Sequence, residues 1–239
     1  MSLLKCENLS FAYDGDLDVL RNVSLQIQPG ETVAIVGPSG GGKTTIAKLI
    51  AGIETPREGS LFFDGTDITN KNVTERAQLG ISYAFQQPVR FKGITVRDLL
   101  ELAAGEKLSE EGLCNYLSNV GLCAREYVDR EVNGALSGGE IKRIEIASVL
   151  ARQTSLAVFD EPEAGIDLWS FTSLIDVFEK LRREQSRTLV IISHQERIME
   201  IADEIIVISG GKVKESGKRE DILPRLLSSG KGCVKCPGH

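Results

Sequence analysis

The stretch Gly37-Pro-Ser-Gly-Gly-Gly-Lys43-Thr44 limits the possible folds more than any other part of this chain. Its spacing, Gly-x-x-x-x-Gly-Lys-Thr, is that of a loop that turns backbone N–H groups inward around phosphate oxygens. Residues 31–36 before it read as a buried strand, and Lys43–Ala51 after it has the apolar periodicity of a helix. A chance glycine turn is the alternative, and the flanking strand and helix disfavour it.

This loop also predicts which side chains bind a nucleotide. Lys43 is expected to reach the β- and γ-phosphates, the Thr44 hydroxyl to ligate Mg²⁺, and Thr45 to contact the α-phosphate. The expected nucleotide-binding residues of the loop are Gly37, Pro38, Ser39, Gly40, Gly41, Gly42, Lys43, Thr44 and Thr45.

The hydrophobic pattern predicts an α/β fold built on a parallel sheet. Residues 155–160 and 188–193 are continuous apolar runs, as strands covered on both faces require. Phe171–Arg183 between them has helical periodicity, residues 3–36 are rich in strand patterns, and Ile205–Lys214 reads as a hairpin. From Val96 to about Val132 the pattern is helical.

The expected organisation is therefore one domain over residues 1–227 with an inserted helical subdomain. The core would comprise residues 1–92 and 149–227, and the helical subdomain about 93–148. Residues 228–239 read as a flexible tail. Cys233 and Cys236 in it could bind a metal or respond to redox, or could simply be two exposed thiols.

The apolar run that begins at Ser155 ends in two acidic residues, Asp160 and Glu161. A carboxylate there would lie at the carboxyl edge of the sheet beside the phosphate loop, where ligands of α/β proteins bind. Asp160 is expected to hold Mg²⁺, directly or through water, and Glu161 to polarise an attacking water. The alternative is a solvated strand end before the turn-forming Pro162.

Three further polar or aromatic residues are candidates. His194 follows another core strand and could contact a γ-phosphate or hold the attacking water, or be a solvated polar residue. Gln86 follows Ile81–Phe85 and could ligate Mg²⁺ and contact water, or belong to a polar loop. Tyr13 could stack on adenine or pack within the N-terminal sheet.

A second anion site is predicted at Leu136-Ser-Gly-Gly-Glu140. Serine and glycine open what reads as a helix, whose first N–H groups are unpaired and whose dipole favours an anion. Ser137, Gly138 and Gly139 are the expected contacts. The chain thus carries two phosphate-binding signatures.

Composition narrows the class of protein and its compartment. The chain is 41% hydrophobic and 26% charged, as in soluble globular proteins, and its net charge of −6 disfavours nucleic acid as a partner. The apolar runs are too short to span a bilayer and no signal peptide is recognised. Five cysteines without a dense framework fit a reducing compartment, so a cytoplasmic location is expected.

Taken in order, these motifs and the stretch Glu163-Ala-Gly-Ile-Asp167 resemble the ATP-binding cassette (ABC) ATPases over about residues 3–224. The resemblance implies a RecA-like P-loop NTPase core with an N-terminal antiparallel β region, ATP and Mg²⁺ as ligands, and ATP hydrolysis. It also implies a head-to-tail dimer in which Ser137, Gly138 and Gly139 bind the γ-phosphate of the partner copy's nucleotide.

The same resemblance assigns adenine stacking to Tyr13, the glutamine-loop role to Gln86 and the switch role to His194. Two residues depart from the family pattern. Glu140 stands where many transporter ATPases have glutamine, and Ala164 where the usual motif has serine.

Within the family, Gly139-Glu-Ile-Lys-Arg143 and residues 84–96 resemble SufC, the ATPase of Suf-type iron–sulfur cluster assembly. That resemblance implies a soluble SufB/SufD-like scaffold subunit as the partner. The alternative is the ATP-binding subunit of a membrane ABC transporter, whose partner would be a separate transmembrane subunit.

Overall fold

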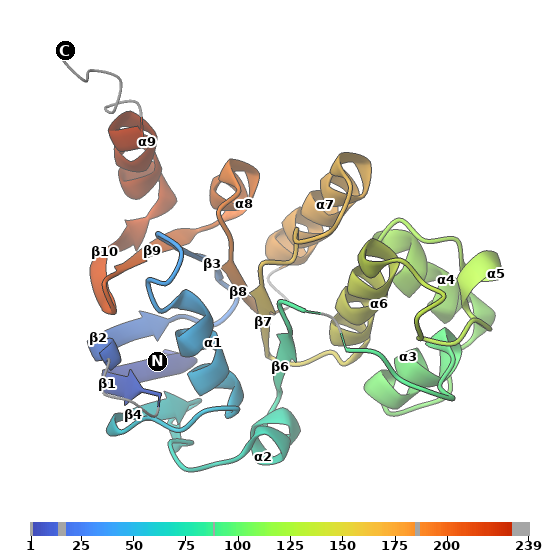
Figure 1. Cartoon of the computed structure of the whole chain (residues 1–239), viewed down its shortest axis with the longest axis horizontal. Helices are drawn as coiled ribbons and strands as arrows, with labels where there is room; N and C mark the ends of the chain where they lie inside the picture. The colour runs from blue at the N-terminus through green and yellow to red at the C-terminus, as the bar shows by residue number, and fades with distance from the viewer. Residues whose placement is uncertain (1, 14–17, 88, 185–186, 231–239) are drawn as a thin grey trace.

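The computed structural model describes residues 2–13, 18–87, 89–184 and 187–230 (Figure 1). Its strands are β1 (Leu4–Ala12), β2 (Asp18–Ile27), β3 (Thr32–Val36), β4 (Glu58–Phe63), β5 (Thr66–Asp67), β6 (Ile81–Ala84), β7 (Leu156–Asp160), β8 (Thr188–Ile192), β9 (Glu204–Ser209) and β10 (Lys212–Lys218). Its helices are α1 (Lys43–Ala51), α2 (Val73–Gln78), α3 (Val96–Ala104), α4 (Glu110–Asn119), α5 (Ala124–Tyr127), α6 (Gly138–Ala151), α7 (Leu168–Glu184), α8 (Glu196–Ile201) and α9 (Arg219–Gly230).

The main sheet has the strand order β10-β9-β3-β8-β7-β6. All its neighbouring pairs are parallel except β9 with β10, which form the expected antiparallel hairpin. Every residue of β3, β7 and β8 is buried, which explains why these strands read as continuous apolar runs. The α/β prediction is confirmed.

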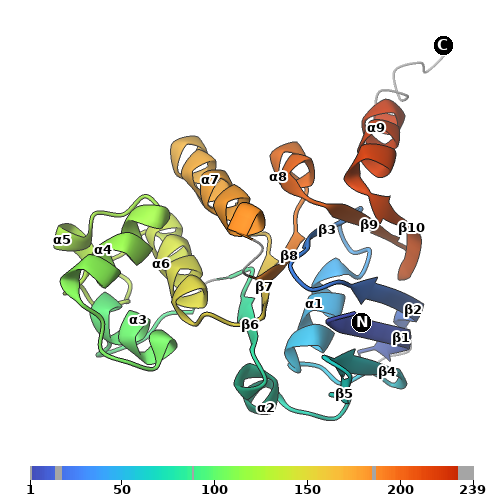
Figure 2. The ribbon, with the colours of Figure 1, turned by 180° about the vertical axis from the view of Figure 1, so that it is seen from behind.

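A second, antiparallel sheet has the order β2-β1-β4-β5 and faces one side of the main sheet. The two sheets and α1 share one apolar core, to which α1 contributes Ile46, Leu49 and Ile50. Figure 2 shows α1 beside both sheets. The first turn of α1 is thereby fixed against the main sheet.

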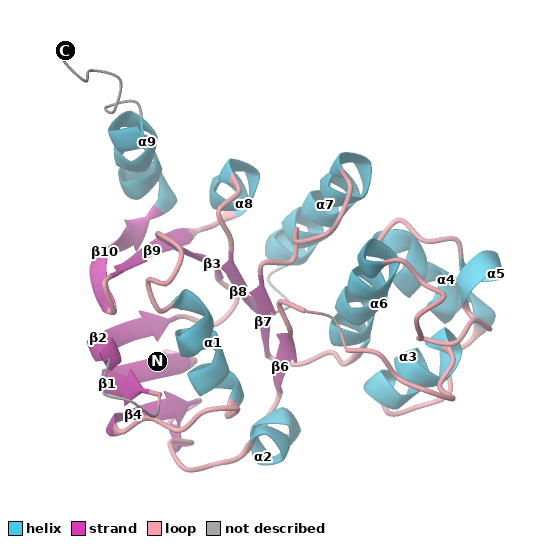
Figure 3. Cartoon of the chain, viewed as in Figure 1, coloured by secondary structure: helices cyan, strands magenta, loops and turns pink. Residues whose placement is uncertain are grey.

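Helices cover the other side of the main sheet (Figure 3). Phe171 and Phe178 of α7, Ile198 of α8 and Ile222 of α9 share a core with the sheet residue Phe159. Helices α3 to α5 lie beyond β6 at the edge of the molecule, and α6 packs against α3 and α4 while leading back to β7 (Figure 1).

Two element ends differ from their predicted positions. Helix α7 begins at Leu168, before the predicted Phe171, because the Asp167 carboxylate accepts hydrogen bonds from the N–H groups of Trp169 and Ser170 (3.1 and 3.0 Å). Helix α9 runs to Gly230, past the residue at which the sequence suggested a tail. Cys233 and Cys236 lie outside the described residues.

Strand register aligns the loops that carry the motifs. Asp160 of β7 is level with Ile192 of β8, and Ile192 is level with Ile35 of β3. The loops after all three strands therefore leave the sheet at one edge. Within the described ranges, no helix is long and apolar enough to cross a membrane.

Candidate nucleotide site

The phosphate loop follows β3 and ends at the first turn of α1. Gly42 has a φ of 104°, and a Cβ there would lie 2.6 Å from Leu20 Cδ2. A Cβ at Gly37 would lie 1.9 Å from the carbonyl oxygen of Ile208. The close packing of the loop against β2 and β9 therefore requires glycine at both positions.

Lys43 is held inside this loop. Its ammonium donates to the carbonyl oxygens of Gly37 (2.8 Å) and Pro38 (3.0 Å), and only 5% of the residue is exposed. Burial lowers the pKa of Lys43, and the nearby charges of Glu161 and Asp160 oppose that shift. The lysine is thus positioned between the loop and two carboxylates, as a phosphate-binding cation should be.

Thr44 and Asp160 form the oxygen-rich part of the site. The Thr44 hydroxyl donates to Asp160 Oδ1 at 3.2 Å, and Asp160 is fully buried at the end of β7. Burial raises the pKa of Asp160. A hydroxyl and a buried carboxylate are the oxygen ligands that Mg²⁺ prefers, so these residues fit a magnesium ion.

Tyr83 completes this group, and the sequence reading missed it. Its hydroxyl donates to Asp160 Oδ2 at 3.0 Å from the neighbouring strand β6. Burial, together with the Asp160 charge, raises the pKa of Tyr83. Tyr83 therefore stays a neutral donor to the carboxylate. No local motif marks Tyr83, because the contact depends on strand pairing.

Glu161 brings the catalytic candidates together. Gln86 Nε2 donates to Glu161 Oε2 at 2.7 Å, and His194 Nε2 lies 3.6 Å from Glu161 Oε1. Glu161 has a φ of 47°, in the left-handed region, and its N–H donates to the carbonyl of Ile192 (2.9 Å). The backbone turn after β7 therefore aims this carboxylate between the loops that follow β6 and β8.

Glu163 is a second residue that the motifs did not identify as functional. Its Oε1 accepts from the Ser193 hydroxyl at 2.6 Å and from the His194 N–H at 3.4 Å. Ser193 is fully buried. Glu163 thus anchors the backbone from which the His194 side chain projects.

A cavity of 430 Å³ opens at this edge of the sheet. It is lined by Tyr13, Val19, Ser39, Gly40, Gly42, Lys43, Thr44, Thr45, Gln86 and Glu161. The structure therefore brings most of the predicted residues together. Gly37 and Pro38 contribute the carbonyls that hold Lys43, and Gly41 N–H closes the loop on the Pro38 carbonyl (3.1 Å).

Tyr13 lies at the mouth of this cavity and is 45% exposed. Its ring packs edge-on against Phe11, with centroids 4.9 Å apart, and the Lys48 ammonium lies 5.8 Å from its centroid. One ring thus serves strand packing while presenting open aromatic surface at the cavity, so both readings of Tyr13 are compatible with its position.

The second anion signature, at the start of α6, lies outside the cavity around Lys43. Ser137 caps α6 and accepts from the Glu140 N–H (3.3 Å), while Glu140 accepts from the Ser137 N–H (2.7 Å). Tyr127 also donates to Glu140, and these bonds lower the pKa of Glu140 to about 2. Neither Ser137, Gly138 nor Gly139 lines the cavity around Lys43. The described part of the chain does not join its two phosphate signatures.

Gly139 is packed too closely for a side chain. A Cβ there would lie 2.6 Å from the carbonyl oxygen of Gly165. The first turn of α6 therefore contacts the stretch from Glu163 to Asp167, which follows Glu161. This contact links the second anion signature physically to the loop that carries the candidate catalytic carboxylate.

Comparison with known proteins agrees with this architecture. Residues 20–164 match the ABC transporter family. The ABC transporter ATP-binding protein MJ0035 of Methanocaldococcus jannaschii is 41% identical, over 98% of this chain and 95% of the relative. The sulfate/thiosulfate import ATP-binding protein CysA of Synechocystis is 33% identical, over 90% of this chain and 60% of the relative.

Solved structures give the same result. The ATP-binding cassette MJ0796, a dimer bound to ADP and Pi in a post-hydrolysis state, aligns with a TM-score of 0.81 at 27% identity, over 90% of this chain and 98% of that chain. The chain therefore belongs to the ABC transporter family and is an ATPase of the ATP-binding cassette type.

Proposed function

We propose that this chain is the ATP-binding subunit of an ABC transporter, in which two copies hydrolyse ATP and drive a separate membrane-embedded partner. The observation that carries the proposal is the convergence of Gln86, Glu161 and His194 beside the buried Lys43. A cytoplasmic location belongs to the proposal, since such a subunit needs a supply of ATP.

The roles of the side chains follow from their positions. Lys43 and the N–H groups of its loop bind the phosphates, and Thr44 and Asp160 would hold a magnesium ion. When bound, Mg²⁺ neutralises charge that develops on the phosphate oxygens. Glu161 accepts a proton from the attacking water, with Gln86 and His194 fixing the position of its carboxylate.

The second anion signature supports a site shared between two copies. Ser137 and the glycines after it open α6, and they do not line their own chain's cavity. Unpaired N–H groups at a helix start are suited to the γ-phosphate of a nucleotide held by another copy. A head-to-tail pair would satisfy both signatures at once.

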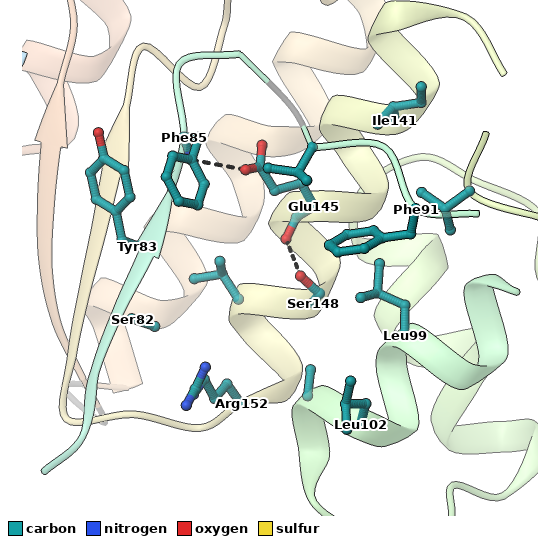
Figure 4. A pocket seen from close by; sticks show the side chains of 14 residues that line it. Ser82, Tyr83, Phe85, Phe91, Leu99, Leu102, Ile141, Glu145, Ser148 and Arg152 are labelled. Atoms are coloured by element: carbon teal, nitrogen blue, oxygen red, sulfur yellow. Dashed lines mark hydrogen bonds between the residues drawn. The ribbon is translucent and has the colours of Figure 1, made fainter. Parts of the chain in front are cut away.

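An apolar cavity of 270 Å³ supports a protein partner (Figure 4). It lies between β6 and α3 and its lining includes Phe85, Val89, Phe91, Leu99 and Leu102. Leu102 is 74% exposed and Val89 is 42% exposed. Because Phe85 precedes Gln86, a partner segment in this groove would lie one residue from the candidate catalytic group.

A soluble iron–sulfur scaffold remains the second candidate for the partner. The motif resemblance around Gly139–Arg143 and residues 84–96 favours it, whereas the names of the relatives favour a transporter. Recovery of the bound partner from native cells distinguishes the two candidates. The chain should be recovered from native cells with a polytopic membrane protein that stimulates its ATPase, and recovery with a soluble β-rich scaffold instead would support the second candidate.

The catalytic assignment is tested by Glu161→Gln. The substitution keeps the size and one oxygen of the side chain but removes its basicity, so hydrolysis should fall by about 100-fold or more. Binding of Mg²⁺–ATP should be unchanged, because phosphate and metal contacts are made by other residues. Equilibrium ATP binding and steady-state phosphate release measure the two effects, and near-normal turnover would remove Glu161 from this role.

A further inference from the structure

We infer that Glu145 of α6 is a positioning residue for hydrolysis, which holds the backbone at Phe85 and thereby fixes Gln86 against Glu161. The inference rests on the proposed function and adds to it a residue that no motif contains. It assigns to α6 a second task beyond presenting Ser137 at its start.

The Phe85 backbone is held by side chains of one helix. Strand β6 ends at Ala84. Beyond it, Glu145 Oε1 accepts from the Phe85 N–H at 2.9 Å, and Lys142 Nζ donates to the Phe85 carbonyl oxygen. Lys142 also lies 3.4 Å from Glu145 Oε2. The two side chains thus clamp the N–H and the carbonyl of Phe85 together.

Burial makes this clamp rigid. Lys142 is fully buried and the Glu145 side chain is 13% exposed. Charged groups this far from water stay in place only when they are paired and hydrogen-bonded. The clamp therefore fixes Phe85 at one position relative to α6, and a displacement of α6 would move Phe85 with it.

The clamp on Phe85 affects the neighbouring Gln86 through one peptide bond. Gln86 follows Phe85 directly, and its amide donates to Glu161 at 2.7 Å. Phe85 lies outside the strand, so the clamp by α6 decides where the Gln86 side chain begins. Displacement of a catalytic group by about 1 Å is enough to cost about 100-fold in rate.

The clamp also faces the partner groove. Figure 4 shows Glu145 and Phe85 on the wall of the apolar cavity, joined by their hydrogen bond, with Phe91 opposite. A segment that fills this groove would contact Glu145, which holds the Phe85 backbone. Glu145 is therefore placed between the docking surface and the Gln86–Glu161 pair, without touching the nucleotide cavity itself.

The test compares Glu145→Ala with a matched buried acid, Glu101→Ala, in the full chain. Glu101 is 9% exposed and accepts from Lys107 Nζ (2.6 Å) and the Leu108 N–H (3.4 Å), so it makes the same kinds of bond to residues other than Phe85. We expect Glu145→Ala to lower kcat for ATP by about tenfold with KM changed less than about twofold, and Glu101→Ala to leave both near normal.

A conservative variant and a double variant separate positioning from loss of fold. Glu145→Gln keeps an oxygen for the Phe85 N–H and should restore most of the rate. In a Gln86→Ala background, Glu145→Ala should lower kcat by less than about twofold more, because both changes act through one group.

Equal loss from Glu101→Ala, full additivity with Gln86→Ala, or no loss from Glu145→Ala would each overturn the inference. If Glu161→Gln loses hydrolysis while Glu145→Ala does not, the inference fails and the proposed function stands. If the unmodified chain hydrolyses no ATP with its partner present, both fail.

Discussion

At the scale of single residues, Asp160 shows how burial prepares a candidate metal ligand. Water is excluded from this carboxylate, and its two oxygens accept from Thr44 and Tyr83. An isolated buried carboxylate would be costly, so neutral donors compensate part of the lost hydration. Burial still disfavours the charged form and raises the pKa of Asp160, and a bound cation would oppose that shift.

Tyr83→Phe tests this view of Asp160. The change removes one donor to a buried carboxylate and should lower the free energy of unfolding by about 1–3 kcal/mol. Urea unfolding measures it, with and without Mg²⁺–ATP. The control is Tyr116→Phe, whose hydroxyl accepts from Gln153 Nε2 (3.2 Å) near the surface. Equal and small losses in the two variants would contradict the assigned role of Tyr83.

Some of these residues were predictable from sequence and others were not. Lys43, Thr44, Asp160 and His194 lie beside glycine turns or at the ends of apolar strands, where spacing alone predicts their location. Glu145 lies in the middle of a helix, and the role inferred for it depends on a hydrogen bond to a backbone 60 positions away in the chain. Contacts of that kind are set by tertiary packing, which no local pattern encodes.

At the scale of elements, α6 connects both parts of the site. It begins at the Ser137 cap and carries Lys142 between one and two turns later and Glu145 about two turns later. The predicted anion site at its start and the clamp on Phe85 therefore belong to one rigid helix. The sequence predicted this helix from its serine and glycine start and its apolar face, although the insertion around it was predicted only as a helical region.

Substitutions at two helix caps distinguish an effect of Ser137 on stability from an effect on ATP turnover. Ser137→Ala and Ser109→Ala each remove a serine that accepts from a backbone N–H at a helix start, Ser109 from the Gly112 N–H at 3.1 Å in α4. Each should lower the free energy of unfolding by about 1 kcal/mol.

Only Ser137→Ala should also lower ATP turnover, because only that cap faces a nucleotide in the proposed pair of copies. Unfolding curves and phosphate release on both variants measure this. Comparable loss of turnover in Ser109→Ala would mean that Ser137 acts through stability alone.

At the scale of the whole molecule, one edge of the main sheet gathers the loops after β3, β7 and β8. The start of α6 touches the loop after β7 but does not line the cavity around Lys43. The parallel strands were readable from their continuous apolar runs. The separation of the two phosphate signatures was not, because it depends on how the helical insertion packs against β6. In the proposed pair, each copy would therefore supply one part of each of two shared sites.

Mixing two inactive variants tests the shared site most directly. Lys43→Ala removes the phosphate-binding ammonium from its own chain's loop. Ser137→Arg blocks only the start of α6, which would contact the nucleotide bound by the other copy. In a mixed pair, the loop of the Ser137→Arg chain meets the intact α6 start of the Lys43→Ala chain. ATP hydrolysis should therefore reappear on mixing, though neither variant is active alone. Mixed pairs that form and remain inactive would contradict a site shared between two copies.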